Sequence, residues 1–390
     1  MAMRKVYMDH SATTPVDRSV LEKMLPFFSD KYGNPNSVHA WGREVRSAVE
    51  EARANVARLI NAEPREILFT GGGSEADNLA IKGVAEVLRD KGRHVVTSAI
   101  EHHAVLDTVK WLGKHGYDVT VLPVDGEGLV DVEEFRKSLR ADTILATVMF
   151  ANNEVGTIQP VREMGMACRE RGILFHTDAV QAAGHIPIDV KDLPFDLMTM
   201  AAHKMYGPKG VGALYVRKGV RLAPLVHGGG QEFGLRSGTE NTAGLVGFGA
   251  AAELAVNRMA EGGIDEERRL RDRLIEGILS GIEDVSLTGH RTLRLPFHAS
   301  FCIRYIEGEA MLLRLDFAGI GASSGSACTS GSLEPSYVLL AMGLDHATAH
   351  GSLRLTLGKD TTEEDIDYIV ETLPPIVKTL RAMSPFKKNA

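Results

Sequence analysis

Asp178 and Lys204 are the two residues whose types and order most clearly suggest chemistry. Asp178 follows the apolar run ILFHT, and Lys204 follows the next apolar run, in AAHKMYGPKG. A lysine at such a position can form a Schiff base with pyridoxal phosphate (PLP), and an aspartate can pair with the pyridinium nitrogen and keep it protonated. A lone lysine is more often a surface residue, but the pairing with Asp178 and the turn-forming GPKG favour the PLP interpretation.

A phosphate group could be held by the segment TGGGSEADN (70–78), which joins a predicted strand to a predicted helix. Its glycines let the backbone approach a ligand, and a helix N-terminus attracts an anion. We expect Ser74 to cap this helix. The competing interpretation is an ordinary glycine-rich turn, because the segment matches neither GxGxxG nor a P-loop.

Three histidines stand beside these segments. His102 and His103 follow the run HVVTSA, where an imidazole could stack on a cofactor ring, and His203 could donate to the phosphate. The alternatives are satisfied surface or core histidines, or half of a metal site. Because no histidine four residues on and no CxxC pair accompany them, the sequence predicts no metal.

Asn153 and Arg354 could bind a substrate. Asn153, in FANNEVG, comes just after a predicted strand, and Arg354 lies within the strand-like GSLRLTLG. A buried arginine needs a partner, and its planar guanidinium grips a carboxylate with two parallel hydrogen bonds. That partner is either an internal Asp or Glu or a substrate carboxylate, and the sequence leaves both possibilities open.

Cys328 lies in the segment GASSGSACTSGS (321–332), where small polar residues offer it little to pack against. Cys168 and Cys302 instead lie in segments that are typical of structural cysteines. A cysteine in an exposed, mobile loop suits a nucleophile that must travel to a reacting atom. The alternative is an incidental loop cysteine.

The elements that must position these residues lie between residues 64 and 217, where short apolar runs alternate with helix-like segments. That alternation predicts βαβ units and a mostly parallel sheet with helices on both faces. Ligands bind at the carboxyl ends of such strands, which is where the candidate residues fall. We expect strands at 66–69, 94–97, 117–124, 143–150, 173–177, 196–200 and 211–216.

The pattern changes after about residue 260, where long helices (264–282 and 362–383) and strands (299–305 and 352–357) indicate a smaller α+β domain. We therefore expect a large PLP-binding domain over 15–260. The small domain is expected to combine residues 1–14 with 261–390 and to carry the cysteine loop.

Composition argues against several classes of function. The chain of 390 residues has a net charge of -7 and no run of Lys and Arg, so neither nucleic acid nor a membrane surface is an expected partner. No apolar stretch approaches the roughly 18 residues of a membrane span, and the N-terminus lacks a secretory signal. Since the cysteines also fit a reducing compartment, we expect the cytoplasm.

Together these segments resemble the cysteine desulfurases of the NifS/IscS type, fold-type I PLP enzymes of the class V aminotransferase family. The resemblance covers nearly the whole chain and implies an aspartate aminotransferase-like α/β fold with a mostly parallel seven-stranded sheet. The segments that carry it are YMDHSATTPVD, GNPNSVH, TGGGSEADN, EHHAVLD, NNEVGTIQP, HTDAVQ, HKMYGPKG, HGGGQEFGLRSGT, SSGSACTSGSLEPSYVL and SLRLTLG.

The resemblance implies a role for each candidate residue. Lys204 forms the Schiff base and moves protons, Asp178 binds the pyridine nitrogen, and Cys328 takes the sulfur of L-cysteine as a persulfide, leaving L-alanine. His102 stacks on the ring and acts as an acid or base. Further contacts are implied for Gly73, Ser74 and His203 (phosphate), Gln181 (ring hydroxyl), Thr239 (phosphate of the neighbouring subunit's cofactor), and Asn153 and Arg354 (substrate carboxylate).

The resemblance also implies partners: a second copy of the chain in a homodimer, and an iron–sulfur scaffold or another sulfur acceptor. Two other functions remain open. A different PLP enzyme of this fold, such as an aminotransferase or a selenocysteine lyase, would keep its activity without Cys328. A non-catalytic binding protein would show no spectral change with cysteine.

Ala201 departs from the family pattern, which has a phosphate-donating serine three residues before the Schiff-base lysine. One charged hydrogen bond is worth roughly 1.5–3 kcal/mol, which the covalent bond and the remaining donors can absorb. We therefore predict weaker cofactor retention, not inactivity. During dialysis against a carbonyl-trapping agent, this protein should lose PLP faster than its Ala201→Ser variant, and equal retention would contradict the prediction.

Overall fold

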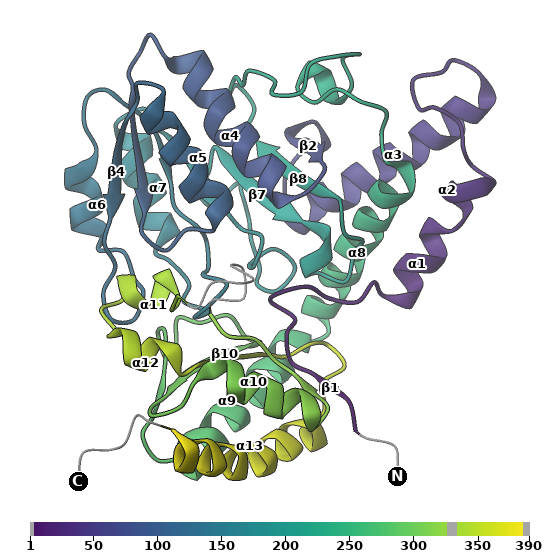
Figure 1. The fold of residues 1–390 in the computed structure, drawn as a ribbon. Helices are drawn as coiled ribbons and strands as arrows, with labels where there is room; N and C mark the ends of the chain where they lie inside the picture. Colours follow the sequence, from purple (N-terminus) through teal and green to yellow (C-terminus); the bar gives the residue numbers. More distant parts are fainter. Residues whose placement is uncertain (1–3, 326–333, 385–390) are drawn as a thin grey trace.

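The largest element of the fold is a seven-stranded sheet with the strand order β2-β8-β7-β6-β5-β3-β4. The computed structural model describes residues 4–325 and 334–384 (Figure 1). All neighbouring strands from β7 to β4 pair in parallel, whereas β8 runs antiparallel to both β2 and β7. This confirms the predicted mostly parallel sheet. Its strands are β2 (Ile67–Thr70), β3 (His94–Ser98), β4 (Asp118–Leu122), β5 (Thr143–Thr147), β6 (Leu174–Asp178), β7 (Leu197–Ala201) and β8 (Gly212–Val216).

Helices cover both faces of this sheet because successive strand residues point to opposite sides. Leu68 packs with α4 and α5 on one face, while its neighbours Ile67 and Phe69 pack with α3 and α8 on the other. The helices of this part are α1 (Arg18–Met24), α2 (Pro26–Ser29), α3 (Ala40–Leu59), α4 (Gly73–Leu88), α5 (His103–Lys114), α6 (Val132–Ser138), α7 (Val161–Glu170) and α8 (Thr242–Ala260).

A second, smaller layer is built on an antiparallel sheet in the order β12-β10-β9, which lies below the large sheet in Figure 1. The N-terminal strand β1 joins this layer by pairing in parallel with β11. Its elements are β1 (Val6–Tyr7), α9 (Gly263–Gly281), β9 (Val285–Leu287), β10 (His298–Ile303), α10 (Gly308–Phe317), β11 (Ile320–Gly321), α11 (Tyr337–Ala341), α12 (His346–His350), β12 (Ser352–Thr356) and α13 (Glu363–Met383).

The N-terminal segment 8–14 runs between the two layers. Asp9 forms a parallel bridge with Thr356 of β12, and the Thr14 amide donates to the carbonyl of His203 at 3.0 Å. One short segment therefore contacts both β12 of the small sheet and the turn that follows β7 of the large sheet. Within the described residues, no helix has the length and apolar character needed to cross a membrane.

Glu101 fixes the chain where it leaves β3 and approaches α5. The Glu101 side chain is fully buried, and one of its oxygens accepts hydrogen bonds from the Ser98 hydroxyl at 2.5 Å and the Met149 amide at 2.9 Å. These bonds tie the end of β3 to the segment that follows β5. Burial raises the pKa of the Glu101 carboxyl to about 8.

This raised pKa predicts how stability should change with pH. A glutamate in an unfolded chain has a pKa of about 4.3, so between that value and about 8 only the folded protein holds the Glu101 proton. Unfolding then releases a proton, and stability falls as pH rises through this window. In Glu101→Gln, the amide keeps an acceptor oxygen and cannot lose a proton. Its melting temperature relative to wild type should therefore rise between pH 5 and pH 8, by about 2 °C or more.

The matched control is Glu51→Gln, since Glu51 is exposed on α3. Thermal unfolding of the three proteins across the pH series measures the effect. A Glu101→Gln profile parallel to that of Glu51→Gln would show that Glu101 is ionised in the folded protein and would contradict the prediction.

Candidate active site

A cavity of about 330 Å³ lies where the carboxyl ends of the large sheet's strands face β12. Most of the residues singled out from the sequence line it, although they come from six separate stretches of the chain. The lining residues are Ser11, Ala12, Gly73, Ser74, Asp77, His102, Met149, Ala151, Asn153, Asp178, Val180, Gln181, Ala201, His203, Lys204 and Arg354.

Asp178 and Lys204 reach this cavity from adjacent strands. Asp178 is the last residue of β6, and Lys204 ends the short 3₁₀ turn Ala202–Lys204 that follows β7. Burial raises the pKa of Asp178, whereas the neighbouring His102, the Val180 amide that donates to this carboxylate, and Lys204 oppose that rise. A cation placed against this carboxylate would favour its ionised form in the same way. The arrangement suits a protonated ring nitrogen.

The Lys204 amine is held by the N-terminal segment. It donates to the carbonyl oxygens of Ser11 and, at 2.8 Å, of Ala12. Gln181 also binds this segment, because its side-chain amide donates to the Ser11 carbonyl at 3.0 Å. Residues 11 and 12 thus fix the position of the lysine without contributing side-chain charge.

The phosphate cradle differs from the sequence expectation in one respect. Gly72, not Ser74, occupies the N-cap of α4, and the helix already begins at Gly73. The reason is conformational: Gly72 has φ = 154°, which residues with a side chain rarely adopt. Ser74 therefore lies in the first turn, where its amide is among those that a helix leaves unpaired. Gly73 and Ser74 both face the cavity, so the N-terminus of α4 can still receive an anion.

His203 and Ala201 lie beside this cradle. Burial and the charges of Lys204 and Lys209 lower the pKa of His203 to about 4, so its ring is neutral at pH 7. Ala201 is buried at the end of β7, and a Cβ built on Gly73 would lie 3.7 Å from the Ala201 methyl group. A side chain at position 201 therefore adjoins the first turn of α4, where a hydroxyl could donate and a methyl group cannot.

His102 is the N-cap of α5, and its Nδ1 accepts a hydrogen bond from the Ala104 amide at 3.1 Å. Burial lowers the pKa of the His102 imidazole. Because Nδ1 accepts, the neutral ring carries its proton on Nε2. Burial thus favours the neutral ring, and the hydrogen bond to Nδ1 selects its tautomer.

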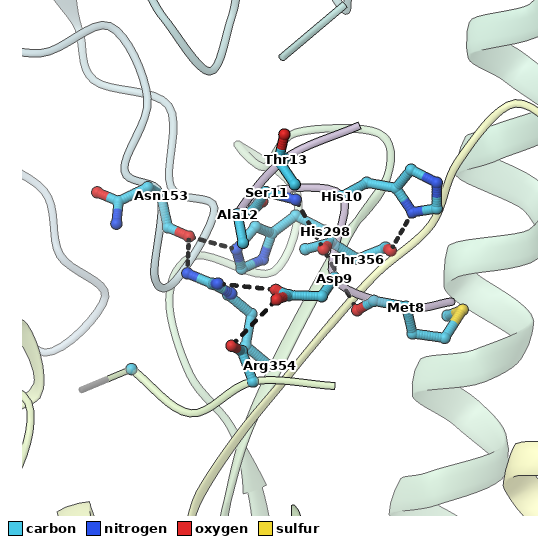
Figure 2. Close-up of polar contacts among 12 residues, drawn as sticks. Met8, Asp9, His10, Ser11, Ala12, Thr13, Asn153, His298, Arg354 and Thr356 are labelled. Carbon is cyan, nitrogen blue, oxygen red and sulfur yellow. Dashed lines mark hydrogen bonds and ion pairs between the residues drawn. The ribbon is translucent and has the colours of Figure 1, made fainter. Parts of the chain in front are cut away.

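Arg354 lies opposite these groups, on β12. The sequence left open whether its partner is an internal acidic residue or a substrate carboxylate. Its Nη2 contacts the Asp9 carboxylate at 2.9 Å, and its Nη1 donates to the Asn153 carbonyl at 3.1 Å (Figure 2). Arg354 therefore has an internal acidic partner. It also lines the cavity, and its Nε has no hydrogen-bond partner in the described structure.

Unpaired buried atoms test whether this cavity fits PLP and an amino acid. Among the described residues, four that line it keep a buried polar atom without a hydrogen-bond partner, and such atoms are costly unless a ligand pairs with them. They are Ser11 Oγ, Asp77 Oδ1, Asn153 Oδ1 and Arg354 Nε. A helix N-terminus for a phosphate, an aspartate for a ring nitrogen, a lysine for an aldehyde and an arginine for a carboxylate share the cavity. The residues present fit the cofactor.

Thr239 is exposed and does not line the cavity. Cys328 lies outside the described residues. Conversely, residue-by-residue reasoning missed Ser11, Ala12 and Asp77. All three stand in segments that carry the family resemblance, so that resemblance could have indicated them. Nothing in the sequence indicates that Met149 and Ala151 line the cavity, because their placement depends on where the chain turns after β5.

The family model of the class-V aminotransferases matches residues 6–369. The cysteine desulfurase IscS of Clostridium botulinum is 55% identical over 384 residues, which cover 98% of this chain and 96% of that protein. The cysteine desulfurase IscS of Dictyoglomus turgidum is 51% identical over 386 residues, covering 99% and 98%. A solved NifS-like protein superimposes with a TM-score of 0.91 at 41% identity, covering 97% of this chain and 100% of its own.

These likenesses extend over both sheets and the cavity between them, and they agree with the predicted family, fold and cofactor. The chain belongs to the class-V aminotransferase family, as a PLP-dependent cysteine desulfurase.

Proposed function

We propose that this cavity removes sulfur from L-cysteine with the residue roles that the sequence suggests. The observation that carries the proposal is the placement of Asp178 and Lys204 on one side of the cavity and Arg354 on the other. PLP, when bound, supplies a ring that withdraws electrons from the Cα and Cβ of the substrate. Asp178 would hold the ring nitrogen, and Gly73, Ser74 and His203 would hold the phosphate.

The substrate would be oriented by its two charged ends. Arg354 and Asn153 both line the cavity that Lys204 also lines, and Arg354 Nε has no hydrogen-bond partner among the described residues. The Arg354 guanidinium and the side-chain amide nitrogen of Asn153 can both donate hydrogen bonds to a carboxylate. An arginine can fix a carboxylate in one plane. With the carboxylate held there and the amine directed at Lys204, the sulfur-bearing carbon must project into the remaining space.

Proton transfers would fall to Lys204 and His102. The Lys204 amine is already directed into the cavity by two backbone carbonyls. His102 is neutral with its proton on Nε2, so it can donate from that nitrogen at neutral pH. The proton that completes L-alanine can come from either group.

Cys328 would accept the sulfur. Cys168 and Cys302 are fully buried free cysteines, and burial raises the pKa of both thiols, to about 12 for Cys302. Neither can supply a thiolate, which is the nucleophilic form. As the Cys328 thiolate attacks, a sulfur–sulfur bond forms and the substrate carbon–sulfur bond breaks. L-Cysteine and one enzyme thiol then give L-alanine and one enzyme persulfide.

The relatives named IscS suggest the setting of this reaction. We propose that the persulfide sulfur passes to an acceptor protein, such as an iron–sulfur scaffold, in the cytoplasm. The net charge of -7 and the absence of a basic run support a protein acceptor over direct contact with nucleic acid.

Replacing Cys328 tests the proposal directly. Cys328→Ser should keep the yellow cofactor and its spectral response to L-cysteine, because the residues proposed to hold the cofactor and the substrate are unchanged. It should lose persulfide formation and sulfide release by about 100-fold or more, because the hydroxyl is a far weaker nucleophile at this pH. Cys302→Ser is the matched control and should retain sulfide release. Full sulfide release by Cys328→Ser would contradict the proposal.

A homodimer is supported by large apolar side chains that are exposed in two neighbouring segments. They project from the region of α1–α3 and from residues 225–233, and Arg53 of α3 links the two segments through an ion pair of 2.8 Å with Glu232. Contiguous exposed apolar surface marks interaction sites. Thr239 is exposed beside it, as a residue that serves a second subunit must be. The apolar residues are Leu21, Leu25, Phe28, Tyr32, Val38, Trp41, Leu225, Val226 and Phe233.

The dimer proposal predicts a solution mass of twice the chain mass by light scattering. Trp41→Asp and Phe233→Asp each place a charge within the proposed interface and should weaken association by about 100-fold. Phe317→Asp on α10 is the matched control, since Phe317 is 76% exposed on a different surface. A monomeric wild-type protein would overturn the proposal.

A further inference from the structure

Asp9 is placed beside Arg354 by the backbone. The N-terminal segment forms a parallel bridge between Asp9 and Thr356, and Arg354 precedes Thr356 by two residues on β12. Residues two apart on a strand project from the same face. The Asp9 side chain therefore reaches the guanidinium, and the two form an ion pair of 2.9 Å with side-chain exposures of 17% and 3%.

The guanidinium is held at both terminal nitrogens. Nη2 contacts Asp9, Nη1 donates to the Asn153 carbonyl, and His298 approaches the same carbonyl at 3.2 Å (Figure 2). Only Nε is left without a hydrogen-bond partner among the described residues. These contacts restrict rotation of a long side chain that would otherwise have many rotamers.

Asp9 is itself fixed in position. Its second carboxylate oxygen accepts from the Ser323 hydroxyl at 3.2 Å. Ser323 is in turn paired with Arg354 through the backbone, since the Arg354 amide donates to the Ser323 carbonyl at 2.7 Å. Asp9, Ser323 and Arg354 thus form a closed set in which each member restrains the others.

We propose that Asp9 is a positioning residue that holds the Arg354 guanidinium in the orientation that receives the substrate carboxylate. The inference rests on the proposed role of Arg354 and goes beyond it. A buried guanidinium without a carboxylate partner would be costly, and a mobile one would bind a carboxylate less well. Asp9 meets both needs from outside the set of groups that touch the substrate.

Asp9 also carries a negative charge close to where a substrate carboxylate would lie, and this repels the substrate. Positioning and repulsion therefore act in opposite directions. Asp9→Asn separates them, because the amide oxygen can still accept from Nη2 while the charge is lost. Asp9→Ala removes both the charge and the acceptor.

The test compares binding of L-alanine with binding of ethylamine, which lacks the carboxylate, through the visible absorption of the holoenzyme. In Asp9→Ala, the dissociation constant for L-alanine should rise about tenfold or more, while that for ethylamine stays within about threefold of wild type. Asp9→Asn should bind L-alanine within about threefold of wild type, or more tightly. The ethylamine response confirms that each variant is folded and holds its cofactor.

A double-mutant cycle isolates the coupling of Asp9 to Arg354. In an Arg354→Gln background, Asp9→Ala should produce no further loss of L-alanine affinity. The matched control is Asp367→Ala, which removes the carboxylate of an exposed ion pair with Arg273 and should leave both ligands unaffected.

Two results would overturn the inference: unchanged L-alanine affinity in Asp9→Ala, or an Asp9→Asn variant as weak as Asp9→Ala. A wild-type protein that binds L-alanine no better than ethylamine would overturn the proposed role of Arg354 itself. Failure of the inference and failure of the proposed function are therefore distinguishable.

Discussion

A buried guanidinium requires a partner, and Arg354 meets this requirement where the two sheets face each other. Asp9 supplies the carboxylate and Asn153 a backbone carbonyl, so one side chain joins the N-terminal segment, the chain after β5, and β12. The same N-terminal segment supplies the carbonyls that hold Lys204. The arginine on one side of the cavity and the lysine on the other are thereby fixed by residues 9, 11 and 12 of a single short segment.

Protonation complements this geometry. Burial raises the pKa of Asp77 well above its ordinary value, raises that of Glu101 to about 8, and lowers those of His102 and His203. Burial therefore favours the uncharged form of each of these four groups. Asp178, Lys204 and Arg354 line the cavity, and each is proposed to meet a charged part of PLP or of an amino acid. Because the uncharged groups around them lower the local dielectric constant, these charged side chains interact more strongly with a charged ligand.

Much of this arrangement could be predicted from the sequence because several site residues directly follow the apolar runs that mark strands. Asp178, Asn153 and Lys204 each follow an apolar run, and parallel strands bring such residues to one edge. Strand limits were less predictable: the expected strands 117–124 and 143–150 end earlier, at Leu122 and Thr147. After Thr147 the chain turns toward the cavity, and the apolar residues that follow pack against other elements, so hydrophobicity alone could not mark the strand end.

Other features had no local signal. The sequence could not show whether Arg354 pairs with an internal carboxylate or with a substrate. Asp9, its internal partner, is distant in the sequence and comes close only in the folded chain. The helix cap at Gly72 depended on a backbone angle that composition does not specify. The proposed division into domains at residues 14 and 260, and the individual roles of the site residues, remain predictions that the structure accommodates.

The most direct measurement is made on the purified wild-type protein. Its visible spectrum is recorded, L-cysteine and a thiol reductant are added, and L-alanine and sulfide are assayed together. The account predicts a yellow protein that releases L-alanine and sulfide in equal amounts. A yellow protein that releases neither would contradict it, and would mean that the cavity between Asp178 and Arg354 serves a different amino acid.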